Sequence, residues 1–265
     1  MSLRHFTMIL DGHAQIDNLL PKNGQLMKES AYQTEYIMRA MRKTFPFGCE
    51  RINFYATETP TRTDAWTVDS IINFQIPFSY EYFTYTDKSQ KEQYLFESMS
   101  NGIRLLCEAK KWDFAEFEKH LTALKDGNFH VEFYQCPKQS PDKTTVAKIY
   151  CVQTMTEATF YVDFYQKRKL VLRKQFAVTD TRAASYRYDI YFLQWKDNRT
   201  VEILGYHKHK TAEVSMDGED NGVSDLMRKC KGDIPNGFNM NTTHTYDEFL
   251  AALNQEHARD FAKAD

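Results

Sequence analysis

The sequence predicts an α+β protein in which a mainly antiparallel sheet of five or more strands, centred on residues 129 to 206, is covered by amphipathic helices. Segments with strand-like alternation follow one another there, separated by short polar turns. Segments with helical spacing cluster before and after this region, as in α+β folds. The aromatic fraction of 14%, with 19 Phe and 16 Tyr, also favours pleated, half-buried surfaces.

The N-terminal part alternates between strand and helix signals. Residues 5 to 10 predict a short strand that ends at an Asp-Gly turn. Between about residues 25 and 45, apolar side chains recur at three- and four-residue spacings with cations late in the run, which predicts an amphipathic helix. Two further strand-like runs cover residues 51 to 57 and 66 to 76.

Three more helices are expected to cover the Phe/Val/Ile face of the sheet. Ser89 and Glu92 form a capping-box pattern ahead of a helix at about 90 to 111. A second helix is predicted over residues 113 to 126, closed by Gly127. A Thr-x-x-Glu pattern starts the last predicted helix, at about 246 to 262.

From residue 129 the apolar period changes from about four to two, which predicts an antiparallel meander. The predicted strands are residues 129–135, 145–154, 158–165, 169–178, 185–195 and 200–206. No proline-rich or serine-rich linker divides the chain, so we expect residues 1–265 to form a single compact unit. A minor boundary is expected near Trp112, between residues 1–112 and a sheet-rich part, 113–265, that includes the C-terminal helix.

Composition excludes several classes of protein. A net charge of −2 predicts no wholesale affinity for nucleic acid or for an anionic membrane. No apolar stretch approaches the roughly 20 residues that span a bilayer, and the N-terminal apolar run is too short for a signal peptide. The five widely spaced cysteines form no Cys-x-x-Cys pair, which indicates reduced thiols. We therefore expect a cytoplasmic protein with no membrane partner.

Two segments of the predicted meander are near twins: FHVEFYQC at residues 129 to 136 and FYVDFYQK at residues 160 to 167. The two-residue period places Phe and Val on the core side of each strand, and the acid and the tyrosine two residues after it on the other side. The strand predicted at 185–195 repeats this phase. The outward pairs are Glu132 and Tyr134, Asp163 and Tyr165, and Asp189 and Tyr191.

These outward residues have three interpretations. They are an ordinary solvent-facing side of a sheet, a partner-binding face rich in tyrosine, or a catalytic site of paired carboxylates. Only about eight residues match, and they do so twice, so a solenoid repeat is excluded. Whether Glu132, Asp163 and Asp189 are adjacent does not follow from the sequence.

Two charge blocks lie in the second half of the chain. Residues 165 to 175 carry five cations and no acid, which indicates either a solvated strand edge or a clamp for phosphate or an acidic partner. Residues 211 to 225 carry five acids and no base. If this loop is exposed, Asp217, Glu219 and Asp220 suit a basic target such as the active-site cleft of a nuclease.

Metal-binding patterns are incomplete. The acidic loop fits a calcium loop up to its ninth position, but Arg228 stands where the bidentate Glu is required. His207 and His209 have a spacing that some zinc enzymes use, although a third ligand among Asp189, Glu213 and His244 is not specified. The sequence therefore predicts no metal and no cofactor.

The chain contains none of the common nucleotide-binding, nucleophile-elbow, zincin or deaminase motifs, and Cys49 is better explained as a buried thiol than as a nucleophile. The leading hypothesis is a non-enzymatic protein-binding module. Its most economical example is an immunity-type inhibitor that neutralises a cognate bacterial toxin by occluding the toxin's active site. The alternative is an enzyme acting on phosphorylated or nucleic-acid substrates, with the basic cations of residues 167–174 holding phosphate and Glu132, Asp163 or His207 as acid, base or ligand.

Overall fold

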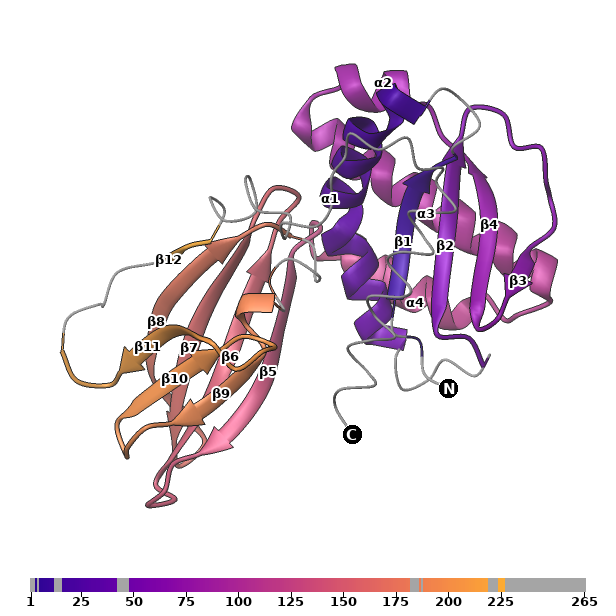
Figure 1. Ribbon diagram of the computed structural model, residues 1–265. Coiled ribbons are helices and arrows are strands. Elements are labelled where there is room, and N and C mark those ends of the chain that lie inside the picture. The colour runs from indigo at the N-terminus through magenta and orange to yellow at the C-terminus, as the bar shows by residue number, and fades with distance from the viewer. Residues whose placement is uncertain are drawn as a thin grey trace.

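The computed structural model describes residues 3, 5–11, 16–41, 48–181, 186, 188–218 and 224–226, with the backbone alone for 16–21 and 224–225. The helix predicted at 246–262 lies outside the described residues, as do Glu219, Asp220 and His244. Figure 1 shows two lobes, one with the helices and the first four strands and the other with the remaining strands. Within the described residues, none of the helices combines the length and the apolar character that crossing a bilayer requires.

The N-terminal lobe contains a four-stranded sheet, here called sheet A. Its strands are β1 (His5–Leu10), β2 (Arg51–Thr57), β3 (Trp66–Val68) and β4 (Ile71–Pro77), in the order β1-β2-β4-β3. β1, β2 and β4 are mutually parallel, and β3 is antiparallel to β4. The run predicted as one strand at 66–76 is thus two strands. A left-handed Asp69 (φ 52°) turns the chain between them.

Sheet A is covered by helices. These are α1 (Ile16–Met41), α2 (Tyr80–Tyr85), α3 (Lys88–Lys110) and α4 (Ala115–Asp126). The Asp87 carboxylate caps α3 by accepting from the Gln90 amide, so this helix starts just before the predicted capping box. A Cβ added to Gly102 would lie 2.8 Å from the Ile76 side chain, so glycine lets α3 pack closely on the sheet.

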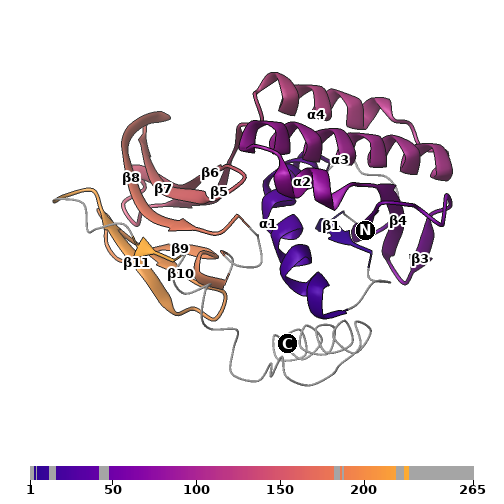
Figure 2. The same cartoon turned by 90° about the horizontal axis from the view of Figure 1, so that it is seen from above.

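The C-terminal lobe is a β-sandwich of two sheets that face each other (Figure 2). Sheet B contains β5 (Val131–Gln139), β6 (Thr145–Gln153), β7 (Ala158–Gln166), β8 (Lys169–Thr179) and β12 (Ser224–Asp225), in the order β12-β8-β7-β6-β5. Sheet C contains β9 (Phe192–Trp195), β10 (Thr200–Leu204) and β11 (Lys210–Ser215), in the order β11-β10-β9. Apart from the short parallel β12, the pairings of both sheets are antiparallel.

The α+β class is therefore correct at the coarse level, but two finer expectations are wrong. Most of the Phe/Val/Ile face of sheet B, including Phe160, Val162 and Phe164, packs against sheet C, whereas Phe133 at its β5 edge contacts helix α1. The strand predicted at 185–195 is a strand only from Phe192 onward. Before it, the Ile190 amide donates to the Tyr186 carbonyl at 2.6 Å, which is a helical turn.

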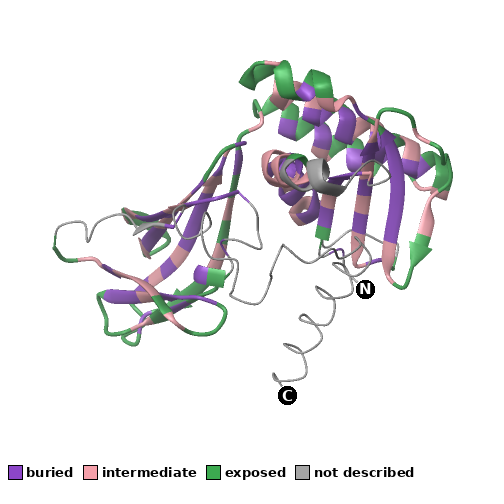
Figure 3. Cartoon of the chain, turned by 45° about the horizontal axis from the view of Figure 1, so that its top comes forward, coloured by how far each residue is buried: buried purple, intermediate pink, exposed green. Residues whose placement is uncertain are grey.

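Each lobe has its own hydrophobic core, and α1 lies between them (Figures 1 and 2). In sheet A, β1 and β4 are largely buried and the edge strand β3 is exposed, whereas β6 and β7 of sheet B alternate between buried and half-buried positions over much of their length (Figure 3). The Thr181 hydroxyl donates to the Lys28 carbonyl of α1 at 2.6 Å, so it connects the segment after β8 to this helix.

The change from helices to strands along the chain follows α4, whereas the minor boundary was predicted near Trp112. That the chain is one unit stays a prediction.

Candidate binding face on sheet B

The twin segments lie on either side of β6. Tyr134 in β5 is opposite Tyr150 in β6, which is opposite Tyr161 in β7. One row further along, Lys148 is opposite Asp163, which is opposite Arg173 in β8. Side chains in one cross-strand row share a face of the sheet. Both rows lie on the side away from sheet C, called the outer face below.

Asp163 is fully buried although it lies on this outer face. Arg173 donates to both of its oxygens, from Nε to Oδ1 and from Nη2 to Oδ2, at 2.7 Å each. The hydroxyls of Tyr134 and Tyr165 lie 3.2 and 3.5 Å from Oδ2. Such a two-pronged pair with added hydrogen bonds satisfies a buried carboxylate. Asp163 therefore holds its neighbours in place and offers no open oxygen as a general base.

Within this network, Tyr134 is exposed and Tyr165 is half-buried. Their hydroxyls are 3.2 Å apart, and Arg173 Nη2 lies 3.3 Å from the Tyr134 hydroxyl. Burial of the Tyr134 hydroxyl raises its pKa well above the ordinary value, and its hydrogen bonds to Tyr165 and Asp163 add to the rise. The Lys148 ammonium lies 4.5 Å from the centre of the Tyr165 ring. The two rings are thus fixed by contacts on several sides.

A second carboxylate–tyrosine pair extends the face. The Tyr150 hydroxyl donates to Glu132 Oε2, and the Arg173 guanidinium lies 3.9 Å from the centre of the Tyr150 ring. Burial, with this hydrogen bond, raises the pKa of Tyr150 to about 12. The same hydrogen bond lowers the pKa of Glu132. The Glu132 side chain is 52% exposed, with His130 Nε2 at 3.4 Å, so it is the carboxylate of this face that solvent reaches.

The structure does not bring Asp189 and Tyr191 to this face. Asp189 is buried, and its Oδ1 lies 3.0 Å from His209 Nε2. The Tyr191 ring packs edge-on against Phe192 and Tyr206. Both residues thus lie beside the aromatic side chains near the β10–β11 turn. They are not on the outer face because the segment before β9 forms a helical turn and not a third matching strand.

The described acids that the sequence offered as candidate metal ligands or as part of the acidic loop are paired with basic side chains. Asp217 pairs with Arg199, and Glu213 lies 3.0 Å from Lys196 and 3.1 Å from Lys210. His209 is the histidine that contacts Asp189. In the part of the chain that the structure describes, no three His, Cys, Asp or Glu side chains are grouped to hold a metal.

Of the groups named for the alternative enzyme, Arg173, Asp163 and Glu132 lie together on the outer face, but His207 and the cations of the β7–β8 turn do not join them. His207 lies at the β10–β11 turn, one end of the sandwich. The cations of the β7–β8 turn lie at the other end of the sandwich. The β5–β6 and β9–β10 turns are also at that end, where the Asp142 amide donates to Asn198 at 3.0 Å. Arg173 is held by Asp163, and Lys174 donates to the Gly218 carbonyl at 2.8 Å.

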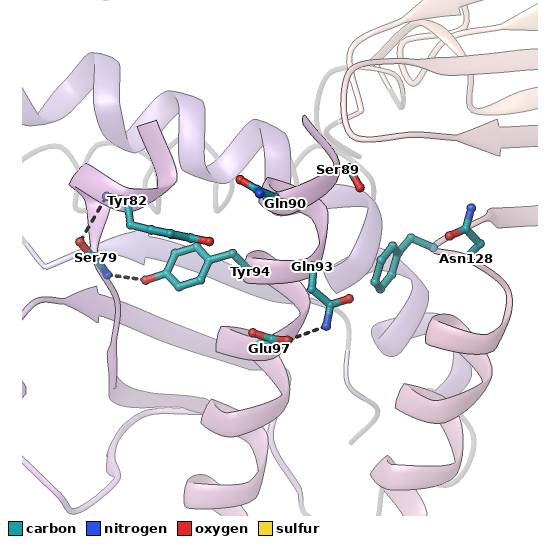
Figure 4. A pocket seen from close by; sticks show the side chains of 9 residues that line it. Ser79, Tyr82, Ser89, Gln90, Gln93, Tyr94, Glu97 and Asn128 are labelled. Carbon is teal, nitrogen blue, oxygen red and sulfur yellow. Dashed lines mark hydrogen bonds between the residues drawn. The ribbon is translucent and has the colours of Figure 1, made fainter. Parts of the chain in front are cut away.

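A hollow of about 830 Å³ lies in the helical lobe, between α2, α3 and the turn before β5 (Figure 4). Its wall includes Tyr94, whose hydroxyl accepts from the Ser79 amide at 2.5 Å, and Gln93, which donates to Glu97 at 2.6 Å. No pattern in the sequence indicates this hollow, because its lining residues come from separate turns of the chain. Its lining is a mixture of hydroxyls, amides and rings with a single carboxylate.

Sequence reasoning missed Lys148, Tyr150 and Arg173 as members of the outer face. The run KIYCVQ in β6 alternates in the same way as the twins and places Lys148 and Tyr150 outward, so the signal was present. Arg173 lies in the basic block of residues 165 to 175, so it was not grouped with the outward residues.

Comparison of the chain with family models, with curated proteins and with solved structures finds no match.

Proposed function

We propose that this protein is a non-enzymatic protein-binding module and that the outer face of sheet B is its binding surface. The observation that carries the proposal is the pair of tyrosines, Tyr134 and Tyr165, held by each other, by Asp163 and by Arg173. Tyr134 is 46% exposed, so a large ring with a hydroxyl is presented to a partner in one fixed position.

Fixed tyrosines suit an interface for two physical reasons. Tyrosine and arginine are the side chains most enriched at binding hot spots, because they combine apolar area with hydrogen bonding. A side chain that is already ordered loses less rotamer freedom when a partner binds. The Asp163 network supplies that order, and β6 lies between the two strands that carry the rings.

The most economical partner is a cognate bacterial toxin whose active site the protein occludes. Glu132 is the exposed acid on the face, and it suits a catalytic Lys or Arg in a basic cleft. Asp163 supports binding indirectly, by positioning Tyr134 and Tyr165. The acidic loop is the second candidate surface, although Asp217 is already paired with Arg199.

The proposal is tested by placing a photo-crosslinking amino acid at position 134 and, in a matched control, at position 85. Tyr85 is 83% exposed and lies in α2 on the other lobe. A crosslinked partner is expected from position 134 and not from 85. The identified partner is then purified and its activity is measured with the wild-type protein and with Tyr165→Ala, which should bind at least about tenfold more weakly.

Three results would overturn this. Equal crosslinking from both positions would remove the outer face as the site. Full affinity after loss of Tyr134, Tyr165 and Tyr191 together would move the site off these tyrosines, and loss only on neutralising Asp217, Glu219 and Asp220 would place it on the acidic loop. A partner whose activity is unchanged by a saturating amount of the wild-type protein would exclude the inhibitor.

A further inference from the structure

Three turns meet at the end of the sandwich that lies away from the helical lobe (Figure 1). Thr145, just after the β5–β6 turn, is opposite Gln166, just before the β7–β8 turn, and their side chains are 3.2 Å apart. The Asp142 amide of the β5–β6 turn donates to Asn198 of the β9–β10 turn at 3.0 Å. Residues at these turns therefore form one continuous surface.

The β7–β8 turn has an unusual sequence for its backbone. Its two central residues, Lys167 and Arg168, have φ of 48° and 66°, and the strands pair again at Gln166 and Lys169. A two-residue turn with both φ values positive is the type that favours Asn-Gly, because side chains with a Cβ strain this conformation. Strained positions that persist in a fold often serve a function other than folding.

Cations dominate the exposed charge of this end. Lys143, Lys167, Arg168 and Lys169 are exposed, and none forms an ion pair with a described residue. Among the described acids near these turns, Asp217 pairs with Arg199, and Asp142 and Asp197 accept hydrogen bonds within their own turns. Asp142 accepts from Ser140 and Thr144, and Asp197 accepts from the amides that follow it.

Two aliphatic side chains stand beside the cations. Leu170 is 47% exposed and Val171 is 48% exposed. Val171 is the extra residue where the β7–β8 pairing shifts, so two consecutive residues of β8 both reach solvent. Leu170 lies opposite Tyr165, at the edge of the outer face.

We propose that this basic tip (Lys143, Lys167, Arg168, Lys169, Leu170 and Val171) docks on an anionic lipid bilayer surface. The four cations would lie among the acidic headgroups, and the two aliphatic side chains would enter the interface beside them. The net charge of −2 averages over the whole chain, whereas a surface responds to the charges within about a Debye length of it.

The aliphatic pair decides between a lipid surface and other anions. A single-stranded nucleic acid is bound by cations together with aromatic rings on which bases stack, and the tip presents Leu and Val instead. This inference stands apart from the proposed function, since neither Tyr134 nor Asp163 belongs to the tip.

The test measures co-sedimentation with phosphatidylcholine vesicles that do or do not contain phosphatidylserine. The wild-type protein should bind the anionic vesicles and lose binding as salt is added. Changing Lys167→Asn together with Arg168→Gly removes two cations and installs the preferred turn. We expect binding to fall about 25-fold, at about fivefold per cation, while the melting temperature stays the same or rises.

A matched double variant, Lys111→Gly with Lys208→Gly, also removes two cations from left-handed positions, with φ of 56° and 60°, at sites away from the tip. It should leave vesicle binding within about twofold of wild type, the difference that loss of long-range attraction alone produces. Changing Leu170→Ser and Val171→Ser should weaken binding to the same vesicles without altering the salt dependence.

Equal binding to neutral and anionic vesicles, or an equal loss in the two double variants, would overturn the inference. Tip-dependent binding to polyglutamate or to single-stranded DNA with none to the anionic vesicles would also overturn it, and would assign the tip to an acidic protein or a nucleic acid. None of these outcomes bears on crosslinking from position 134, so the two proposals fail separately.

Discussion

The guanidinium carbon of Arg39, in the last turn of α1, lies 3.5 Å from the centre of the Phe133 ring in β5. The same side chain donates from Nε to Glu35 at 2.7 Å, and Glu35 is buried and also accepts from the Tyr186 hydroxyl at 3.2 Å. One arginine therefore joins the helix of the first lobe to the sandwich of the second, by stacking on a ring and by neutralising a buried acid.

Arg39→Ala should lower the free energy of unfolding by about 2 to 4 kcal/mol, because it removes a cation that pairs with the buried Glu35 and stacks on the Phe133 ring. Arg39→Lys should recover part of this loss, since lysine keeps the charge but not the planar stacking group. Urea unfolding measures both. If the arginine couples the lobes, circular dichroism and tryptophan fluorescence should report different midpoints in the Ala variant. An unchanged midpoint in Arg39→Ala would show that the contact adds nothing to stability.

Asp163→Ala should destabilise the protein by about 2 to 3 kcal/mol, because it removes the acceptor of a buried two-pronged pair. Arg173, at 36% side-chain exposure, can then be solvated, which keeps the cost below that of a fully buried ion. Glu132→Ala, on the same face but exposed, should change stability by less than about 0.5 kcal/mol. Thermal unfolding of the two variants tests this, and equal losses would mean that burial of Asp163 has no energetic consequence.

The burial of Asp163 changes the role that the sequence suggested for this residue. The two-residue period placed Asp163 on the outer face correctly, since it lies opposite Lys148 and Arg173. Periodicity does not report what covers a side chain within a face. Arg173 and the hydroxyls of two tyrosines cover this one, and Asp163→Ala is now expected to weaken folding as well as partner binding.

The parallel strands of sheet A were the main part of the fold that went unpredicted. β1, α1 and β2 form a strand–helix–strand unit whose strands are parallel neighbours, yet they were predicted only as separate elements, and α1 begins at Ile16 and not at about residue 25. Pairing between strands that are far apart in sequence depends on packing of the intervening helix. Local periodicity carries no direct information on it.

The segment before β9 shows how a tertiary contact overrides a local pattern. Tyr186, Tyr188, Ile190 and Phe192 alternate as in a strand. Asp189 is instead drawn to His209 at 3.0 Å, and the Thr211 hydroxyl donates to the Asp189 carbonyl at 2.5 Å. Both partners come from beyond the next turn, so a reading of residues 185–195 alone could not include them.

Stability should fall as the pH rises from 10 to 12, because folding raises the pKa of Tyr150 from 10.0 to about 12. The folded state then holds this proton when the unfolded chain has lost it. The stabilisation is complete below pH 10 and is lost as the pH approaches 12. Tyr150→Phe should flatten this fall by roughly 1 to 2 kcal/mol.

Urea midpoints across this pH range measure the fall. The thiols of Cys49 and Cys107, whose pKa values burial raises to about 11, act in the same direction, so the Phe variant should retain part of the slope. Identical slopes in the wild type and in Tyr150→Phe would contradict the role of Tyr150.

Gly205→Ala should destabilise the sandwich by about 3 kcal/mol or more, through overpacking against backbone. A Cβ at this position would lie 2.1 Å from the Tyr188 carbonyl oxygen and 2.1 Å from His209 Cε1. The carbonyl is not free to move aside, since it accepts from the Tyr206 amide at 2.9 Å, and the imidazole is held by Asp189.

Gly24→Ala provides the matched control. Gly24 lies within α1 with nothing within 4 Å of an added Cβ, so the change should stabilise the protein by about 1 kcal/mol. Chemical unfolding of the two variants should therefore give shifts of opposite sign, and a stable Gly205→Ala protein would show that the β10–β11 turn has room to rearrange around His209.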